Sequence, residues 1–164
     1  MLVLGIDPGT ATTGYGLVRE HPDGRLEAVA YGVITTPARR PMQDRLMQIY
    51  EEITALIVQY QPDSVAVETL FFGKNVTTAI TVAQGRGVIL LALAQAGIPM
   101  REYKPAEIKQ AIAGYGNADK IQVQEMIRQL LDLDEIPRPD DAADGLGVAI
   151  TDINASRFER LSQS

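Results

Sequence analysis

The chain contains no cysteine among its 164 residues, and its one histidine, His21, lies beside a proline in a turn-like segment. Disulfides, thiolate nucleophiles, zinc–thiolate sites and iron–sulfur clusters are therefore excluded, which fits a reducing cytosol. The N-terminus lacks the basic segment that opens a signal peptide, and the apolar runs are shorter than a bilayer requires. We expect a cytoplasmic protein without a membrane partner, and we assign His21 no role.

Acidic side chains are missing from one long stretch, although the net charge of the chain is −6. No Asp or Glu occurs from Thr69 through Arg101, which includes Lys74 and Arg86. An overall negative charge argues against a polyanionic partner, but a segregated positive segment can still bind one. Acids instead crowd into a later stretch, where the only cation is Arg138 among Asp132, Asp134, Glu135, Asp140, Asp141 and Asp144.

The composition predicts a single domain over residues 1–164, because 46% hydrophobic and 22% charged residues are ordinary globular values. An apolar strand ends at Asp7, and two further strand patterns cover residues 14–19 and 26–34 around a turn signal at residues 21–24. An amphipathic helix is predicted between Pro41 and Pro62, followed by a short buried strand from Ser64 that ends at Glu68.

The second half of the chain predicts mainly helices. Residues 74–96 form a helix pattern that is apolar nearly all round, so we expect the sheet to cover one side and a second copy of the protein to be a candidate for the other. A strand over residues 98–103 and three helices follow, which start near Pro105, Asp119 and Pro139. Right-handed crossovers then place the fourth strand beside the first. The fold class is therefore α/β, with a five-stranded mixed sheet of order 3-2-1-4-5, an antiparallel second strand, helices on both faces and a ribonuclease H-like layout.

Four carboxylates are candidates for one site. Asp7 and Glu68 end neighbouring parallel strands, and Asp141 and Asp144 are three residues apart on one helical face. Each has an ordinary alternative role: Asp7 in an Asp-Pro-Gly turn, Glu68 at a solvated strand end, and the aspartates at a helix N-terminus. Gly145 and Gly147 weaken the last alternative, because they lower helix propensity and permit close approach to the sheet.

A cluster of four carboxylates would be partly protonated by mutual repulsion unless a multivalent cation neutralised it. Magnesium prefers oxygen ligands and keeps waters for a substrate phosphate. Two such ions roughly 4 Å apart can clamp the attacking and leaving oxygens of an in-line displacement at phosphorus. The candidate metal ligands and catalytic residues are thus Asp7, Glu68, Asp141 and Asp144.

Several segments together resemble the RuvC family of crossover junction endodeoxyribonucleases, in order and across nearly the whole chain: LGIDPGTATTGYG, VAVET followed by Phe71, KNVTTA, QGRG, KPAEIKQAIAGYGNADKIQVQ and PDDAADGLGVAI. The resemblance implies a homodimeric, magnesium-dependent Holliday junction resolvase, with two ions per site and Mn2+ as a substitute. It implies symmetric nicking of two strands of like polarity, 5′-phosphate and 3′-hydroxyl ends, and the RuvA and RuvB branch-migration complex as partner.

The same motif match assigns the four carboxylates as catalytic. It also implies that Lys109 and Lys120 act near the scissile phosphate, although isolated lysines are usually solvated. Asp140 departs from the pattern as an additional acid, for which a helix cap is the simplest role. Some relatives carry a histidine at the position of Asp141, which leaves the role of that residue open.

Further residues are candidate DNA contacts. The residue matching Phe71 stacks on an exposed base in the family, whereas the sequence alone equally allows Phe71 and Phe72 to be core residues. The remaining candidates are polar or basic and could reach phosphates: Lys74, Asn75, Arg86, Arg101 and Lys104.

Two other classes of protein share part of this pattern. A strand ending in Asp-x-Gly-Thr before a glycine-bearing hairpin also occurs in sugar kinases and actin-like ATPases, but 164 residues leave no room for their second domain. A junction-binding module without catalysis would be favoured by a missing carboxylate, and none is missing. ATP binding would distinguish the first of these classes.

Overall fold

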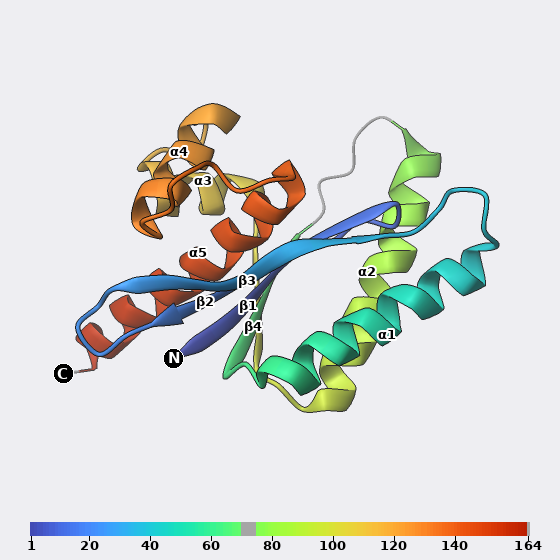
Figure 1. Ribbon diagram of the computed structural model, residues 1–164, viewed down its shortest axis with the longest axis horizontal. Helices are drawn as coiled ribbons and strands as arrows, with labels where there is room; N and C mark the ends of the chain where they lie inside the picture. Colours follow the sequence, from blue (N-terminus) through green and yellow to red (C-terminus); the bar gives the residue numbers. More distant parts are fainter. Residues whose placement is uncertain (70–74, 164) are drawn as a thin grey trace.

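The computed structural model has a central five-stranded sheet of order β3-β2-β1-β4-β5, as predicted (Figure 1). The structure describes residues 1–69 and 75–163. β2 is antiparallel to β1 and β3, whereas β4 is parallel to both β1 and β5. The strands are β1 (Leu2–Asp7), β2 (Thr12–Glu20), β3 (Leu26–Thr35), β4 (Ser64–Glu68) and β5 (Met100–Tyr103).

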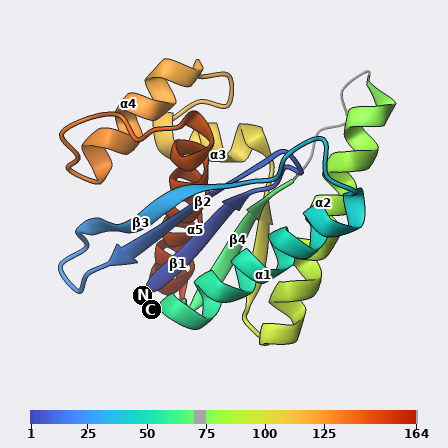
Figure 2. The same ribbon diagram turned by 45° about the vertical axis from the view of Figure 1, so that its right-hand side comes forward.

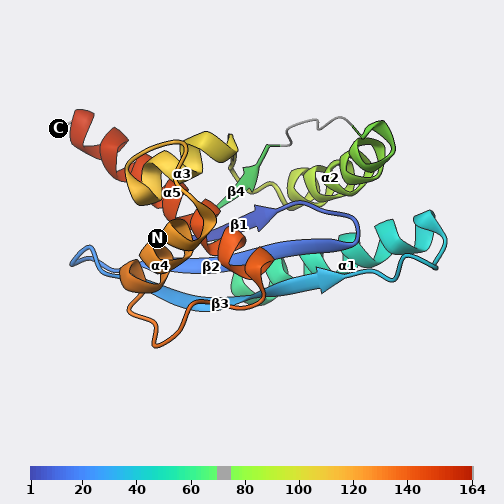
Figure 3. The same ribbon diagram turned by 90° about the horizontal axis from the view of Figure 1, so that it is seen from above.

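Helices cover both faces of the sheet, as the views in Figures 2 and 3 show. One face carries α1 (Met42–Tyr60) and α2 (Val76–Ala96). The other carries α5 (Asp140–Ser162), with α3 (Pro105–Ala113) and α4 (Lys120–Leu130) packed against it. β5 begins two residues later than predicted, because Pro99 has no N–H to donate and joins the sheet only through its carbonyl, 2.9 Å from the Val65 nitrogen.

Alternation along β1 separates two hydrophobic cores. Leu2, Leu4 and Ile6 point toward α1 and α2, whereas Val3 points toward α5. β4 follows the same rule, since Val65 and Val67 belong to the first core and Ala66 to the second. Gly5 and then Asp7 follow Val3 on the same face of β1, and Glu68 follows Ala66 on the same face of β4. The alternation of side chains along the two strands therefore directs both carboxylates toward α5.

α5 lies directly on the backbone of the sheet, at a trough of glycines. A Cβ at Gly14 would lie 1.8 Å from the main-chain oxygen of Asp141, and a Cβ at Gly5 would lie 2.1 Å from that of Gly145. Gly145 itself approaches the backbone of Tyr15, as predicted, but Gly147 does not face the sheet. Its Cβ would meet Ile112 and Ile127, so Gly147 provides space for α3 and α4 instead.

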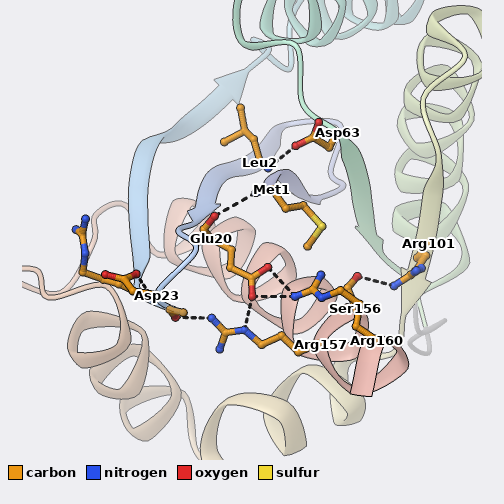
Figure 4. A network of polar contacts seen from close by, with 11 residues as sticks. Met1, Leu2, Glu20, Asp23, Asp63, Arg101, Ser156, Arg157 and Arg160 are labelled. Carbon is orange, nitrogen blue, oxygen red and sulfur yellow. Dashed lines mark hydrogen bonds and ion pairs between the residues drawn. The ribbon is translucent and has the colours of Figure 1, made fainter. Parts of the chain in front are cut away.

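Polar contacts fix the far half of α5 (Figure 4). Arg157 Nε donates to Glu20 at 2.6 Å, and Arg160 donates to the same carboxylate at 2.9 Å. Arg101 Nη1 on β5 donates to Ser156 Oγ at 2.9 Å. These contacts attach α5 to β2 and β5 at its C-terminal half, so its acidic first turn is held over the end of β1.

The expectation that no apolar run could span a membrane was wrong for α2. Its 21 residues are long and apolar enough by length and composition alone, and only 22% of an 18-residue window is buried. Ile89 and Leu93 nevertheless contribute to the core between the sheet and helices α1 and α2. One helix of this kind is weak evidence for a membrane span, because core helices of soluble proteins can be equally long and apolar.

Candidate active site

Three carboxylates meet where β1 ends beneath the first turn of α5. Asp7 is opposite Gly14 in the β1–β2 register, and the main chain of Asp141 rests on Gly14. Ligand oxygens of Asp7, Asp141 and Asp144 all lie within 4.8 Å of one another. The glycine trough is therefore what allows a helix to bring its acidic turn to the end of the strand.

Glu68 lies beside Asp7, because β4 is the parallel neighbour of β1 and Ile6 is in register with Val67. Burial, followed by the charge of Glu68, raises the pKa of Asp7 from 3.8 to about 8. Burial also raises the pKa of Glu68, and a hydrogen bond with Asp7 and the charge of Lys109 oppose that rise. Without a cation, this hydrogen-bonded pair of carboxylates therefore keeps a proton at pH values well above the ordinary pKa range of a carboxyl group.

Asp144 is a third group with a perturbed acidity. Burial and the charge of Asp7 raise its pKa from 3.8 to about 6. The cluster offers only carboxylate oxygens, and their mutual repulsion is what a divalent cation would relieve. The donor set therefore fits a hard cation such as Mg2+, with Asp7, Asp141 and Asp144 as ligands and Glu68 adjacent.

Two lysines lie at this acidic site, and they are the two that the family resemblance implies to act near the scissile phosphate. Lys109 on α3 and Lys120 on α4 line a cavity of about 190 Å³ together with Glu68 and Asp144. Ile108 and Val123 form part of its apolar wall. The cavity therefore brings positive side chains and carboxylates to one place, as stabilisation of a negatively charged reacting group would require.

Asp140 is separate from the cluster and does not cap α5. Its carboxylate forms ion pairs with Lys120 Nζ at 3.2 Å and Arg138 Nη1 at 2.6 Å. The hydrogen bond from Lys120 helps to hold the pKa of Asp140 below its ordinary value. The N-cap position of α5 is Pro139, without a side-chain capping bond, so the capping role considered for the aspartates does not hold for this helix.

The turn after Asp7 is held by threonines that the sequence analysis missed. Thr13 Oγ1 donates to the Gly9 carbonyl at 2.6 Å, and Thr36 Oγ1 donates to the Thr10 carbonyl at 2.5 Å. Thr10 donates to the main chain of Thr81 on α2, where Gly85 leaves room for its hydroxyl. These bonds hold the turn through threonine hydroxyls. A turn-forming role therefore does not explain why a carboxylate is present at Asp7.

Buried Arg45 extends this network from α1. Its Nε donates to Thr36 Oγ1 at 2.9 Å, and its residue exposure is only 8%. An arginine on an otherwise apolar helix face was the available signal for this anchor, as was the run of threonines after Asp7. The loop that follows the first carboxylate is thereby fixed to both α1 and α2.

The candidate DNA contacts differ in their surroundings. Phe71, Phe72 and Lys74 lie outside the described residues. Arg86 forms an ion pair with Glu102, and Asn75 caps α2 by accepting from the Thr78 nitrogen at 3.3 Å. Lys104 is exposed immediately after β5. For all of these residues, a contact with DNA stays a prediction.

Among the DNA-contact candidates that the structure describes, Arg101 has the most side-chain partners. Besides Ser156, it pairs with Glu159 at 2.9 Å and with buried Asp152 at 3.5 Å. Asp152 in turn accepts from Ser64 at 2.9 Å and from Tyr103 at 2.8 Å. A phosphate contact by Arg101 would have to compete with these partners on α5.

The sheet order, the helices on both faces and the acidic cluster at the end of β1 define the ribonuclease H-like class. The sequence model "Crossover junction endodeoxyribonuclease RuvC" matches residues 3–152. A protein of that name from Syntrophomonas wolfei is 56% identical over 164 residues, covering 100% of this chain and 95% of its own. Its counterpart from Chloroflexus aggregans is 61% identical over 150 residues, or 92% of this chain and 91% of its own.

Solved structures agree with the sequence comparison. A Thermus thermophilus RuvC structure has a TM-score of 0.91 and 35% identity, covering 97% of both chains. The T. thermophilus RuvC in complex with Holliday junction substrate has a TM-score of 0.88 and 32% identity, covering 96% of both chains. The chain therefore belongs to the RuvC family of crossover junction endodeoxyribonucleases, which are nucleases that hydrolyse DNA.

Proposed function

We propose that residues 1–164 form a single nuclease domain that resolves Holliday junctions in recombination and repair. The observation that carries this proposal is the meeting of Asp7, Asp141 and Asp144 within 4.8 Å, with Glu68 beside Asp7. Bound Mg2+, two ions per site and replaceable by Mn2+, would polarise the scissile phosphate and supply a nucleophilic water. Family membership supports this use of the cluster.

The side chains have distinct tasks in this proposal. Asp7, Glu68, Asp141 and Asp144 would hold the cations, which would supply charge stabilisation at the scissile phosphate. Lys109 and Lys120 line the same cavity, so their ammonium groups stabilise negative charge that develops at the phosphate. Cleavage on the side that leaves a 5′-phosphate and a 3′-hydroxyl gives ends that a ligase can join.

Junction binding is proposed for residues near this edge of the sheet and for the acid-free segment. Phe71 and Phe72 follow β4 in sequence and would hold an unpaired base by stacking. Phosphate contacts are assigned to Lys74, Asn75, Arg86, Arg101 and Lys104. We further propose a cytoplasmic protein that works with the RuvA and RuvB branch-migration complex and has no membrane partner.

A synthetic four-way junction, compared with linear duplex of the same sequence, tests the function directly. We expect magnesium-dependent, paired nicks in opposite arms of the junction, little cleavage of the duplex and none in EDTA. Religation of the nicked products tests the 5′-phosphate and 3′-hydroxyl ends. Equal cleavage of both substrates, or ATP binding without cleavage, would contradict the proposal.

We propose that α2 forms the interface between two copies. Its apolar or small residues at 76, 80, 83, 87, 91 and 94 recur at intervals of three and four, so they share one face. Val76, Ile80 and Leu91 are 70%, 55% and 53% exposed, whereas Ile89 and Leu93 on the opposite face are buried. A two-fold pair would cover this face and supply the two equivalent sites that symmetric nicking needs.

Ile80→Glu combined with Leu91→Glu tests the α2 interface. Two buried charges should weaken dimerisation by at least about tenfold, because unpaired charges at an interface centre are strongly unfavourable. Sedimentation velocity measures the dimer. Nicking of a synthetic four-way junction then shows how often the two nicks occur as a pair rather than singly. Val58→Glu is the matched control, because Val58 is 69% exposed on α1. A double variant that remains dimeric would exclude this face as the interface.

A further inference from the structure

Asp140 connects the acidic turn of α5 with the start of α4. It is the first residue of α5, and its Oδ2 lies 3.2 Å from the ammonium of Lys120, the first residue of α4. Its other oxygen faces Arg138 at 2.6 Å. Asp140 is therefore the acid that pairs with a cavity lysine while lying outside the carboxylate cluster.

The backbone of Lys120 is fixed, but its side chain is not held by packing. Asp119 caps α4 by accepting from the Gln122 nitrogen at 2.9 Å, which sets the position of the first turn. The Lys120 side chain is 57% exposed, and a lysine has a flexible stem that packing alone would leave in many rotamers. The charged groups around its ammonium therefore determine where it lies.

Two sets of acids attract this ammonium. Asp140 is its ion-pair partner at 3.2 Å, and the charges of Asp144 and Asp141 in the cluster also act on it. Lys109 lines the same cavity, next to Glu68, and repels a second ammonium there. Without Asp140, only the repulsion from Lys109 would oppose the attraction toward Asp144 and Asp141, and the ammonium would shift toward the place of a bound cation.

We propose that Asp140 is a positioning residue that holds the Lys120 ammonium at the rim of the carboxylate cluster. At the rim, the ammonium can reach a scissile phosphate without competing with metal for Asp141 and Asp144. This inference rests on the proposed function of Lys120 and the four carboxylates. It assigns a role to an acid that the family pattern does not require.

A double-mutant cycle isolates this role: the parent, Asp140→Asn, Lys120→Gln and the combined variant. Single-turnover junction nicking is measured at saturating Mg2+ and protein. Asp140→Asn should slow nicking by roughly three- to fivefold, the range that an exposed ion pair supports. In the Lys120→Gln background the same change should slow it by less than about 1.5-fold, because its effect passes through Lys120.

Two single variants are matched controls. Arg138→Gln removes the other cation paired with Asp140 and should leave nicking within about twofold of the parent, since the Lys120 pair remains. Asp140→Glu keeps the negative charge, so its nicking rate should also stay within about twofold of the parent rate. Junction affinity in EDTA should not fall in Asp140→Asn, because the variant loses a negative charge that faces phosphate.

Direct Mn2+ binding without DNA, followed by electron paramagnetic resonance, gives a readout besides activity. Asp140→Asn should weaken Mn2+ binding more in the parent than in the Lys120→Gln background, because only the parent has an ammonium that can enter the cluster. Equal effects of Asp140→Asn in the two backgrounds, on nicking and on Mn2+ binding, would overturn the inference. If the parent itself does not nick junctions in Mg2+, the proposed function fails instead.

Discussion

Asp7→Asn, Glu68→Gln, Asp141→Asn and Asp144→Asn should each lower junction nicking by at least about a hundredfold while leaving junction binding intact. An amide has nearly the shape of the carboxylate but loses a charge and a strong metal ligand, and even indirect supports of a metal site are worth tenfold or more. Ligand oxygens of three of these residues lie within 4.8 Å of one another, so losing one disturbs the whole donor set.

Binding and cleavage should change in opposite directions in these variants. Amides at Glu68, Asp141 and Asp144 delete like charges that face phosphate, whereas Asp7 is largely protonated in EDTA at neutral pH, so junction affinity in EDTA should stay equal or rise. Nicking is measured in Mg2+, affinity in EDTA, and folding by thermal melting. Asp134→Asn is the matched control, because Asp134 is an exposed acid of the same stretch outside the cluster. Four folded variants that nick at the parent rate would leave only local structural roles for these acids.

The sheet and the position of two carboxylates could be predicted because they follow from local patterns. Strand ends and the right-handed crossover rule place Asp7 and Glu68 on adjacent parallel strands, and the order 3-2-1-4-5 is confirmed. The three-residue spacing of Asp141 and Asp144 likewise follows from helix geometry. These predictions need only the periodicity of each element and the hand of its connections.

The approach of α5 to the sheet could be predicted only in part. Gly145 was recognised, but its partners Gly5, Gly14 and Gly16 were not, although they share the β-sheet face of Val3 by strand parity. Gly147 was assigned to the sheet and instead faces Ile112 and Ile127. A glycine indicates that something approaches closely, whereas the identity of its neighbour depends on the tertiary fold.

The contacts that support the site were harder to predict, because they join residues distant in sequence. Thr10 contacts α2 through Thr81, and Arg45 reaches the same loop through Thr36. The run of threonines after Asp7 indicates local hydrogen bonds, but nothing local shows which distant residues Thr10 and Thr36 contact. Likewise, the pairing of Asp140 with Lys120 requires the packing of α4 beside α5 to be known.

Without divalent cation, the thermal stability of the protein should fall as pH rises from about 4 to about 8. Folding raises the pKa of Asp7 from 3.8 to about 8, so in this window the folded state binds a proton that the unfolded state releases. Raising the pH removes that proton and favours unfolding. Asp144, with a pKa of about 6, adds to the effect in the lower half of the window.

Calorimetry in EDTA at pH 5 and pH 8, repeated with Mg2+, tests this linkage. The melting temperature of the parent should drop by at least about 5 °C between the two pH values, since each kcal/mol corresponds to roughly 2–4 °C in a domain of this size. Mg2+ should raise the melting temperature more at pH 8, where ligands need not first lose protons.

Asp7→Asn cannot bind this proton, so its melting temperature should depend less on pH than that of the parent. If parent and variant show the same pH dependence in EDTA, the shared proton is not at Asp7. The repulsion that a cation would relieve must then arise elsewhere in the cluster.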